Sequence, residues 1–71
     1  MPKLYSSKEI ESVLKKLGLV FASQKGSHGK FKHKDGRILV LPMNRKEIPI
    51  GTFRSILRQA NISLQDFEKL F

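Results

Sequence analysis

The sequence predicts one α+β domain over residues 1–71, with the order α-β-β-β-α and a short helix at the C-terminus. Two stretches with apolar residues at helical spacing flank a central region of short apolar segments, and an Asp-Gly pair lies within that region. Three strands with short connections form an antiparallel sheet, and amphipathic helices need an apolar surface to cover. We therefore expect a three-stranded antiparallel sheet with the helices packed on one face and the other face open to solvent.

The first helix is predicted over residues 7–17. Ser6 and Glu9 have the spacing of a capping box, in which each side chain accepts a hydrogen bond from the backbone of the other residue. Gly18 follows the last apolar residue and is typical of a helix end, where the backbone turns left-handed. The apolar stripe that should face the core consists of Ile10, Val13, Leu14 and Leu17.

The central region predicts three strands, over residues 19–24, 29–34 and 37–41. Asp35-Gly36 favours a two-residue type I′ turn, which makes Lys34 the partner of Arg37. This register turns Phe31 and His33 toward the core. The cross-strand pairs that it predicts are Phe31–Val40, His33–Ile38, Lys32–Leu39, Lys30–Leu41 and His28–Met43.

A second helix is predicted to start near Pro49 and to end at Asn61, a residue type that favours helix C-caps. Ser63, with Asp66 three residues later, predicts the start of a short final helix. The residues expected in the core are Phe53, Ile56, Leu57 and Ala60 from the second helix, and Leu64, Phe67 and Leu70 from the last. Phe21 and Phe31 are expected in the core as well, so base stacking on the sheet is not expected.

The charge points to a polyanionic partner. The chain has 14 Lys and Arg against 6 Asp and Glu, a net charge of +8. Such an excess on a small domain attracts phosphates, and we expect nucleic acid rather than a membrane surface. The absence of cysteine excludes disulfides, thiolate metal sites and a thiol nucleophile. The acidic residues are scattered, so no metal or other cofactor is expected. No signal peptide or membrane-spanning stretch is recognised, and a cytoplasmic location is expected.

The candidate site is Gly26-Ser27-His28-Gly29, which lies between Lys25 and Lys30. Strand alternation places His28, Lys30 and Lys32 on one side of the sheet, which we expect to be the open face. Histidine both accepts and donates a proton near neutral pH, which suits cleavage of a phosphodiester beside a 2′-hydroxyl. Lysines around it hold the phosphate and stabilise negative charge on its oxygens. The alternative is a histidine that only contacts a phosphate or a base.

The second helix adds Arg54 and Arg58, which lie four residues apart and form a local basic ridge. This ridge is either a further RNA contact or a solvated helix face. His33 falls on the opposite side of its strand from His28 and is interpreted as a half-buried structural residue. A mechanism that uses both histidines is therefore not expected.

The residues also resemble a known family. Gly26-Ser27-His28, together with Gly-Thr-Phe-Arg-Ser-Ile-Leu at residues 51–57, resembles the HicA toxins of prokaryotic toxin–antitoxin pairs over nearly the whole chain. The resemblance implies a fold like the double-stranded-RNA-binding domain (dsRBD). It also implies a ribonuclease that cleaves messenger RNA until a HicB-type antitoxin occludes its site, with His28 as the catalytic histidine. Gly29 departs from the family pattern, in which a bulky residue commonly follows this histidine.

The sequence and the resemblance together predict a metal-independent endoribonuclease, a monomer when free, that uses His28. The general acid stays open among Lys25, Lys30 and Ser27. The alternatives are a non-catalytic RNA-binding module that uses the same face and an interaction protein whose charge serves an acidic protein partner. The residues expected to bind RNA are Lys25, Ser27, Lys30, Lys32, Arg54 and Arg58.

Overall fold

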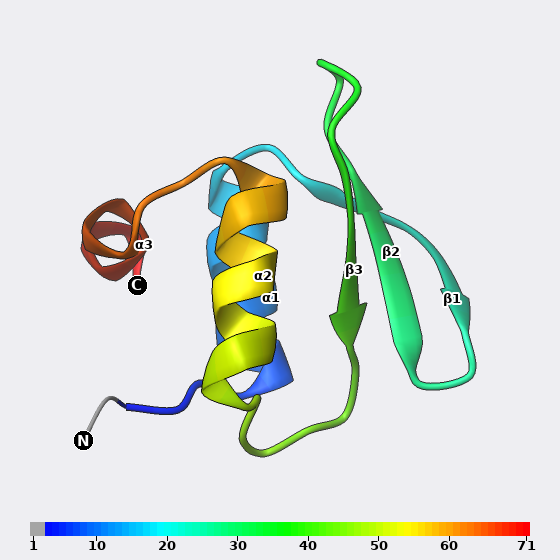
Figure 1. Ribbon diagram of the computed structural model, residues 1–71. Coiled ribbons are helices and arrows are strands. Elements are labelled where there is room, and N and C mark those ends of the chain that lie inside the picture. Colours follow the sequence, from blue (N-terminus) through cyan, green and yellow to red (C-terminus); the bar gives the residue numbers. More distant parts are fainter. Residues whose placement is uncertain (1–2) are drawn as a thin grey trace.

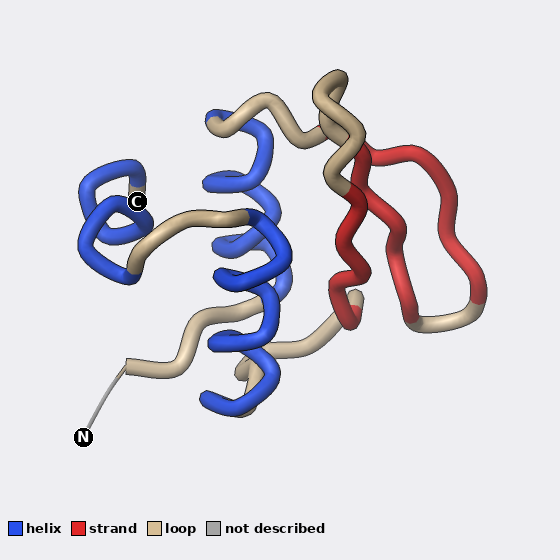
Figure 2. The backbone as a smooth tube through the Cα atoms, turned by 45° about the horizontal axis from the view of Figure 1, so that its top comes forward, coloured by secondary structure: helices blue, strands red, loops and turns tan. Residues whose placement is uncertain are grey.

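A computed structural model describes residues 3–71 and confirms the predicted order of helices and strands (Figure 1). The three strands form one antiparallel sheet in the order β1-β2-β3. Helices α1 and α2 lie on the same side of this sheet, and α3 lies beyond them, near the C-terminus (Figures 1 and 2). The elements are α1 Ser7–Lys16, β1 Val20–Lys25, β2 His28–Lys32, β3 Ile38–Pro42, α2 Ile50–Ala60 and α3 Leu64–Leu70.

The helix ends follow the local sequence signals. The Ser6 hydroxyl accepts the Glu9 backbone N–H at 3.1 Å, and the Ser6 N–H donates to the Glu9 carboxylate at 2.9 Å, which confirms the capping box. Gly18 has φ +88° just after α1, and Asn61 caps α2 with φ +56°, both as predicted. Ser63 is the N-cap of α3, and its hydroxyl accepts a hydrogen bond from the Asp66 N–H.

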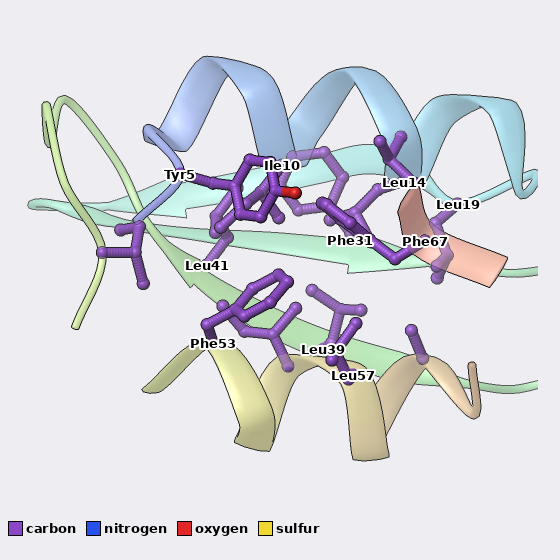
Figure 3. Close-up of a cluster of buried hydrophobic side chains, with 14 residues drawn as sticks. Tyr5, Ile10, Leu14, Leu19, Phe31, Leu39, Leu41, Phe53, Leu57 and Phe67 are labelled. Carbon is purple, nitrogen blue, oxygen red and sulfur yellow. The ribbon is translucent and has the colours of Figure 1, made fainter. Parts of the chain in front are cut away.

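The core lies between the sheet and the helices (Figure 3). Tyr5 packs its ring 5.2 Å from that of Phe53 and 5.0 Å from that of Phe67, so the segment before α1 joins α2 to α3. The predicted stripes of α1 and α2 are buried, except that Leu17 is only partly buried. The sheet contributes Phe31, Leu39 and Leu41.

Two apolar residues that we expected in the core lie at the surface. Phe21 in β1 is 46% exposed, because neither helix covers this edge strand, although its ring meets Phe31 edge-on at 5.7 Å. Leu64 is 48% exposed, because the seven-residue helix α3 buries only Phe67 fully. Leu70 is partly buried against the core.

The predicted register of the β2–β3 hairpin is wrong by one residue. His33, not Lys34, pairs with Arg37. The His33 N–H donates to the Arg37 carbonyl at 2.9 Å, and the Gly36 N–H donates to the His33 carbonyl at 3.0 Å. Gly36 has φ +99°, so the loop has three residues and ends in a left-handed glycine instead of forming the two-residue turn. The observed pairs are His28–Pro42, Gly29–Leu41, Lys30–Val40, Phe31–Leu39 and Lys32–Ile38.

This shift reverses the two faces of β3. Leu39 and Leu41 join Phe31 in the core, whereas Ile38 and Val40 lie with the lysines of β2 on the uncovered face. The predicted outward position of His28, Lys30 and Lys32 is unaffected, because all three remain on the face opposite Phe31.

Ser7 joins the start of α1 to the loop after β3. Its hydroxyl donates to the Pro42 carbonyl at 2.6 Å and accepts the Arg45 N–H at 3.0 Å. Its backbone N–H donates to the Arg45 carbonyl at 3.0 Å. The residue is 2% exposed, so water has little access to these groups.

Replacement of this serine should therefore destabilise the fold. Ser7→Ala leaves the Pro42 carbonyl and the Arg45 N–H without a partner, and we expect it to lower the free energy of unfolding by about 1–3 kcal/mol in urea denaturation. Ser12→Ala changes an exposed serine of the same helix and is the matched control. Equal urea midpoints for the two variants would contradict this role of Ser7.

The hairpin loop should make stability depend on pH. The Arg37 backbone N–H donates to the Asp35 carboxylate and, with the nearby Arg37 and His33 charges, holds the pKa of Asp35 below its ordinary value of 3.8. The stabilisation by the carboxylate is complete above 3.8 and is lost as the pH falls through the lower pKa of the folded state. We expect Asp35→Asn to unfold at lower urea than the unmodified chain near neutral pH, and the difference to disappear in acid. A difference that stays constant with pH would contradict this assignment.

Candidate functional site

The uncovered face of the sheet, called here the open face, carries three rows of side chains, one from each strand in every row. The residues alternate along each strand with those that face the helices. Basic residues run the whole length of β2, and aliphatic residues of β1 and β3 flank them toward the hairpin loop. The rows are Lys25–His28–Pro42, Ser23–Lys30–Val40 and Val20–Lys32–Ile38.

A β-bulge in β1 creates this arrangement. Phe21 pairs with Phe31, but the next pair is Ser23 with Lys30, so Ala22 is the extra residue. Without it, the alternation that begins at Phe21 would turn Ser23 and Lys25 toward the helices. The bulge re-aims both onto the open face, which places Lys25 directly across from His28.

His28 lies in a shallow hollow of about 230 Å³ that is lined by Ser23, Lys25, His28, Lys30 and Val40. We call it the histidine hollow. Lys25, His28 and Lys30 are all exposed, so the imidazole and both ammonium groups are accessible from solvent. Of the residues predicted to bind RNA, Lys25 and Lys30 thus lie beside the histidine.

Two other predicted residues lie near the histidine hollow but do not line it. Lys32 lies one row beyond Lys30, between Val20 and Ile38, and extends the basic part of the open face along β2. Ser27 lies in the loop between β1 and β2, after Gly26, which has φ +59°. The Gln24 side chain donates to the Gly26 carbonyl at 2.9 Å and braces this loop.

The positive charge of the open face has no partner within residues 3–71. The ion pairs found in this range join Lys3 to Glu9, Lys15 to Glu11 and Arg37 to Asp35, and the His33 ring contacts the same Asp35 carboxylate. None of them involves Lys25, Lys30 or Lys32. An anionic ligand would therefore meet ammonium groups that no carboxylate of the fold neutralises.

His33 lies at the other end of the hairpin and has a structural role, as predicted. Its side chain is 15% exposed, and its Nδ1 lies 3.0 Å from the Asp35 backbone nitrogen and 2.9 Å from the carboxylate. The ring also packs on Gly18, where a Cβ atom would come within 3.0 Å of Nε2. His33 takes no part in the histidine hollow.

Arg54 and Arg58 lie away from the open face. They line a separate hollow of about 510 Å³ with Leu57, Asn61, Ile62 and Ser63, which we call the arginine hollow. All of these residues belong to α2 or to the connection to α3. The structure therefore divides the predicted RNA-binding residues between two surfaces.

Sequence reasoning did not identify Ser23 or Val40 as residues of the site. Ser23 reaches the open face only through the bulge, and a bulge depends on pairing with another strand, for which β1 itself carries no clear signal. Val40 reaches it through the three-residue loop, and Gly36 is the residue type that such a loop also requires.

Comparison with known proteins assigns the family. None of the helices in residues 3–71 is long and apolar enough to cross a membrane. A search of curated proteins finds no match. A family model described as the HicA toxin of bacterial toxin–antitoxin systems matches residues 7–62, which include α1, the whole sheet with His28, and α2. The chain therefore belongs to the HicA toxin family and is the toxin of a pair in which an antitoxin is the partner.

Proposed function

We propose that this toxin is an endoribonuclease that cleaves messenger RNA, with His28 as the group that moves the proton. The observation that carries the proposal is the exposed imidazole in the histidine hollow, between two unpaired ammonium groups on the uncovered face. A solvent-accessible base beside cations suits phosphodiester cleavage, in which one group removes a proton and others stabilise negative charge on the phosphate oxygens. The family assignment supports a toxic activity for this chain.

In the proposed reaction, His28 accepts the proton of an RNA 2′-hydroxyl while the 2′-oxygen attacks the adjacent phosphorus. The bond from phosphorus to the 5′-oxygen breaks, and that oxygen leaves with a proton from a general acid. The products are a 2′,3′-cyclic phosphate and a 5′-hydroxyl. Lys25 and Lys30 stabilise the charge that develops on the non-bridging oxygens. Base and cations all come from the chain, so the proposed step is metal-independent.

Three residues are candidates for the general acid. Lys25 and Lys30 line the histidine hollow, and Ser27 directly precedes His28 in the loop. The ammonium groups carry a proton at neutral pH, whereas a serine hydroxyl can donate only within a hydrogen-bonded relay. The lysines are therefore favoured for this role.

The RNA would lie along β2. Alternate side chains of a strand are about 6.6 Å apart, so His28, Lys30 and Lys32 extend about 13 Å along β2 and can contact several phosphates. Lys25 and Ser27 flank its first residue. Arg54 and Arg58 would contact RNA that continues past the sheet, because the arginine hollow shares no residue with the open face.

We expect a HicB-type antitoxin to inhibit the toxin by covering the open face. Val20, Ile38 and Val40 are 60%, 50% and 42% exposed there, which is unusual for side chains of this size in a small domain. Their combination with three unpaired lysines suits an antitoxin surface that has both acidic and apolar side chains. Such a surface would exclude RNA from His28.

The assignment of His28 can be tested by cleavage of messenger RNA in EDTA. We expect His28→Ala to reduce the rate by about 10²–10⁴-fold, the usual contribution of a general base. His33→Asn removes the other histidine of the chain but leaves the histidine hollow unchanged, and it should keep the activity if it folds. Equal cleavage by His28→Ala and the unmodified chain would exclude His28 as the base, and no cleavage by the unmodified chain would exclude the enzyme.

The RNA path can be tested by the salt dependence of binding, with 2′-O-methyl RNA as a ligand that lacks the attacking hydroxyl. Each lost phosphate contact lowers the slope of log K against log salt by about 0.7 for a single strand, and we expect this change for Lys30→Ala. Lys69→Ala removes the same charge from α3 and should leave the slope unchanged. An unchanged slope for Lys30→Ala would show that this lysine does not contact the RNA. The same measurement on Arg54→Ala and Arg58→Ala tests whether the arginine hollow contacts the RNA.

A further inference from the structure

Met43 directly follows β3 and contacts the main chain on both sides of His28. Its backbone N–H donates to the Ser27 carbonyl at 2.6 Å. This hydrogen bond continues the β2–β3 ladder one step beyond the pair His28–Pro42. The Val40 N–H points away from β2 and toward the Gln59 side chain of α2. The backbone nitrogen of Pro42, two residues later, also points away from β2. The missing N–H of Pro42 therefore costs no ladder hydrogen bond, and Met43 provides the bond nearest to His28.

The side chain of Met43 occupies the space that a side chain at position 29 would need. Gly29 is buried on the face of β2 opposite to His28. A Cβ atom on Gly29 would lie 2.9 Å from the Met43 Sδ and 3.1 Å from its Cγ, well inside van der Waals contact, and 3.5 Å from the Phe21 ring. The thioether thus lies directly over the Gly29 backbone, and the rest of the side chain packs against the core.

We infer that Met43 is a positioning residue for His28, an inference that rests on the proposed ribonuclease function. The backbone of Met43 hydrogen-bonds to Ser27, and its side chain packs against Gly29. The main chain is therefore restrained on both sides of His28. The imidazole itself stays free on the open face. Glycine at position 29 makes this contact possible, because a Cβ atom there would meet the Met43 Sδ at 2.9 Å and would force the thioether to move.

Kinetics of Met43 variants test this role. Met43→Ala keeps the backbone hydrogen bond but removes the thioether, and we expect kcat to fall about tenfold through loss of alignment, with KM within about twofold because the RNA-binding lysines remain. Met43→Leu conserves the volume and should restore kcat to within about twofold of the unmodified chain. Leu70→Ala, a half-buried residue of α3, controls for loss of stability, which urea denaturation measures for each variant.

A pair of substitutions tests the shared volume. Gly29→Ala alone forces Met43 to move, and we expect kcat to fall. Met43→Ala added to Gly29→Ala makes room for the new Cβ atom, so the double variant should be more active than Gly29→Ala and at least as active as Met43→Ala. Losses that simply multiply in the double variant would contradict the shared volume.

A measurement that needs no catalysis separates this inference from the proposed function. In NMR spectra, the His28 imidazole signals should shift or broaden in Met43→Ala and stay unchanged in Met43→Leu and Leu70→Ala. Unchanged His28 signals in a folded Met43→Ala variant would overturn the positioning role, even if the chain cleaves RNA. If the unmodified chain does not cleave RNA, the ribonuclease proposal fails, while the spectra still show whether Met43 orders His28.

Discussion

The arrangement of the site depends on the burial of Phe31 at the centre of the sheet. This ring is fully buried between β2 and the helices and is among the largest side chains of the core. Because side chains alternate along a strand, a buried Phe31 requires Gly29 to face the helices and His28, Lys30 and Lys32 to face away from them. A reversal of β2 would bury three polar residues and expose a phenylalanine, so the hydrophobic core itself determines where the imidazole and the ammonium groups lie.

The open face carries features that lower the stability of the isolated chain. Its lysines repel one another with no acidic partner in residues 3–71, and its aliphatic residues remain in contact with water. A fold of 71 residues has little stability to spare. An anionic ligand would relieve the charge repulsion, and a partner protein that covers the face could relieve both effects, so the same properties that weaken the free toxin favour its complexes.

Local signals predicted the helices well and the sheet less well. The capping box at Ser6, the left-handed residue Gly18 and the apolar stripe of α2 involve residues that are close in sequence, so a short window contains all that they require. The hairpin register was missed by one residue, because Asp35-Gly36 fits both a two-residue turn and a three-residue loop. The choice is made by Leu39 and Leu41, which gain burial only in the second register. The exposure of Phe21 likewise reflects the absence of a helix over β1.

The sequence by itself determined the α+β order, the excess of positive charge, and the outward position of His28, Lys30 and Lys32, because alternation and helical periodicity are properties of the chain alone. Only the tertiary structure decided which residues join His28. The bulge at Ala22 adds Ser23 to the site and turns Lys25, which the sequence already placed nearby, onto the open face, and the observed register moves Met43 from the predicted place opposite His28 to a contact at Gly29. The tertiary structure also places Arg54 and Arg58 on a different surface from His28. These placements arise from strand pairing and packing between segments distant in sequence, and no local pattern records such contacts.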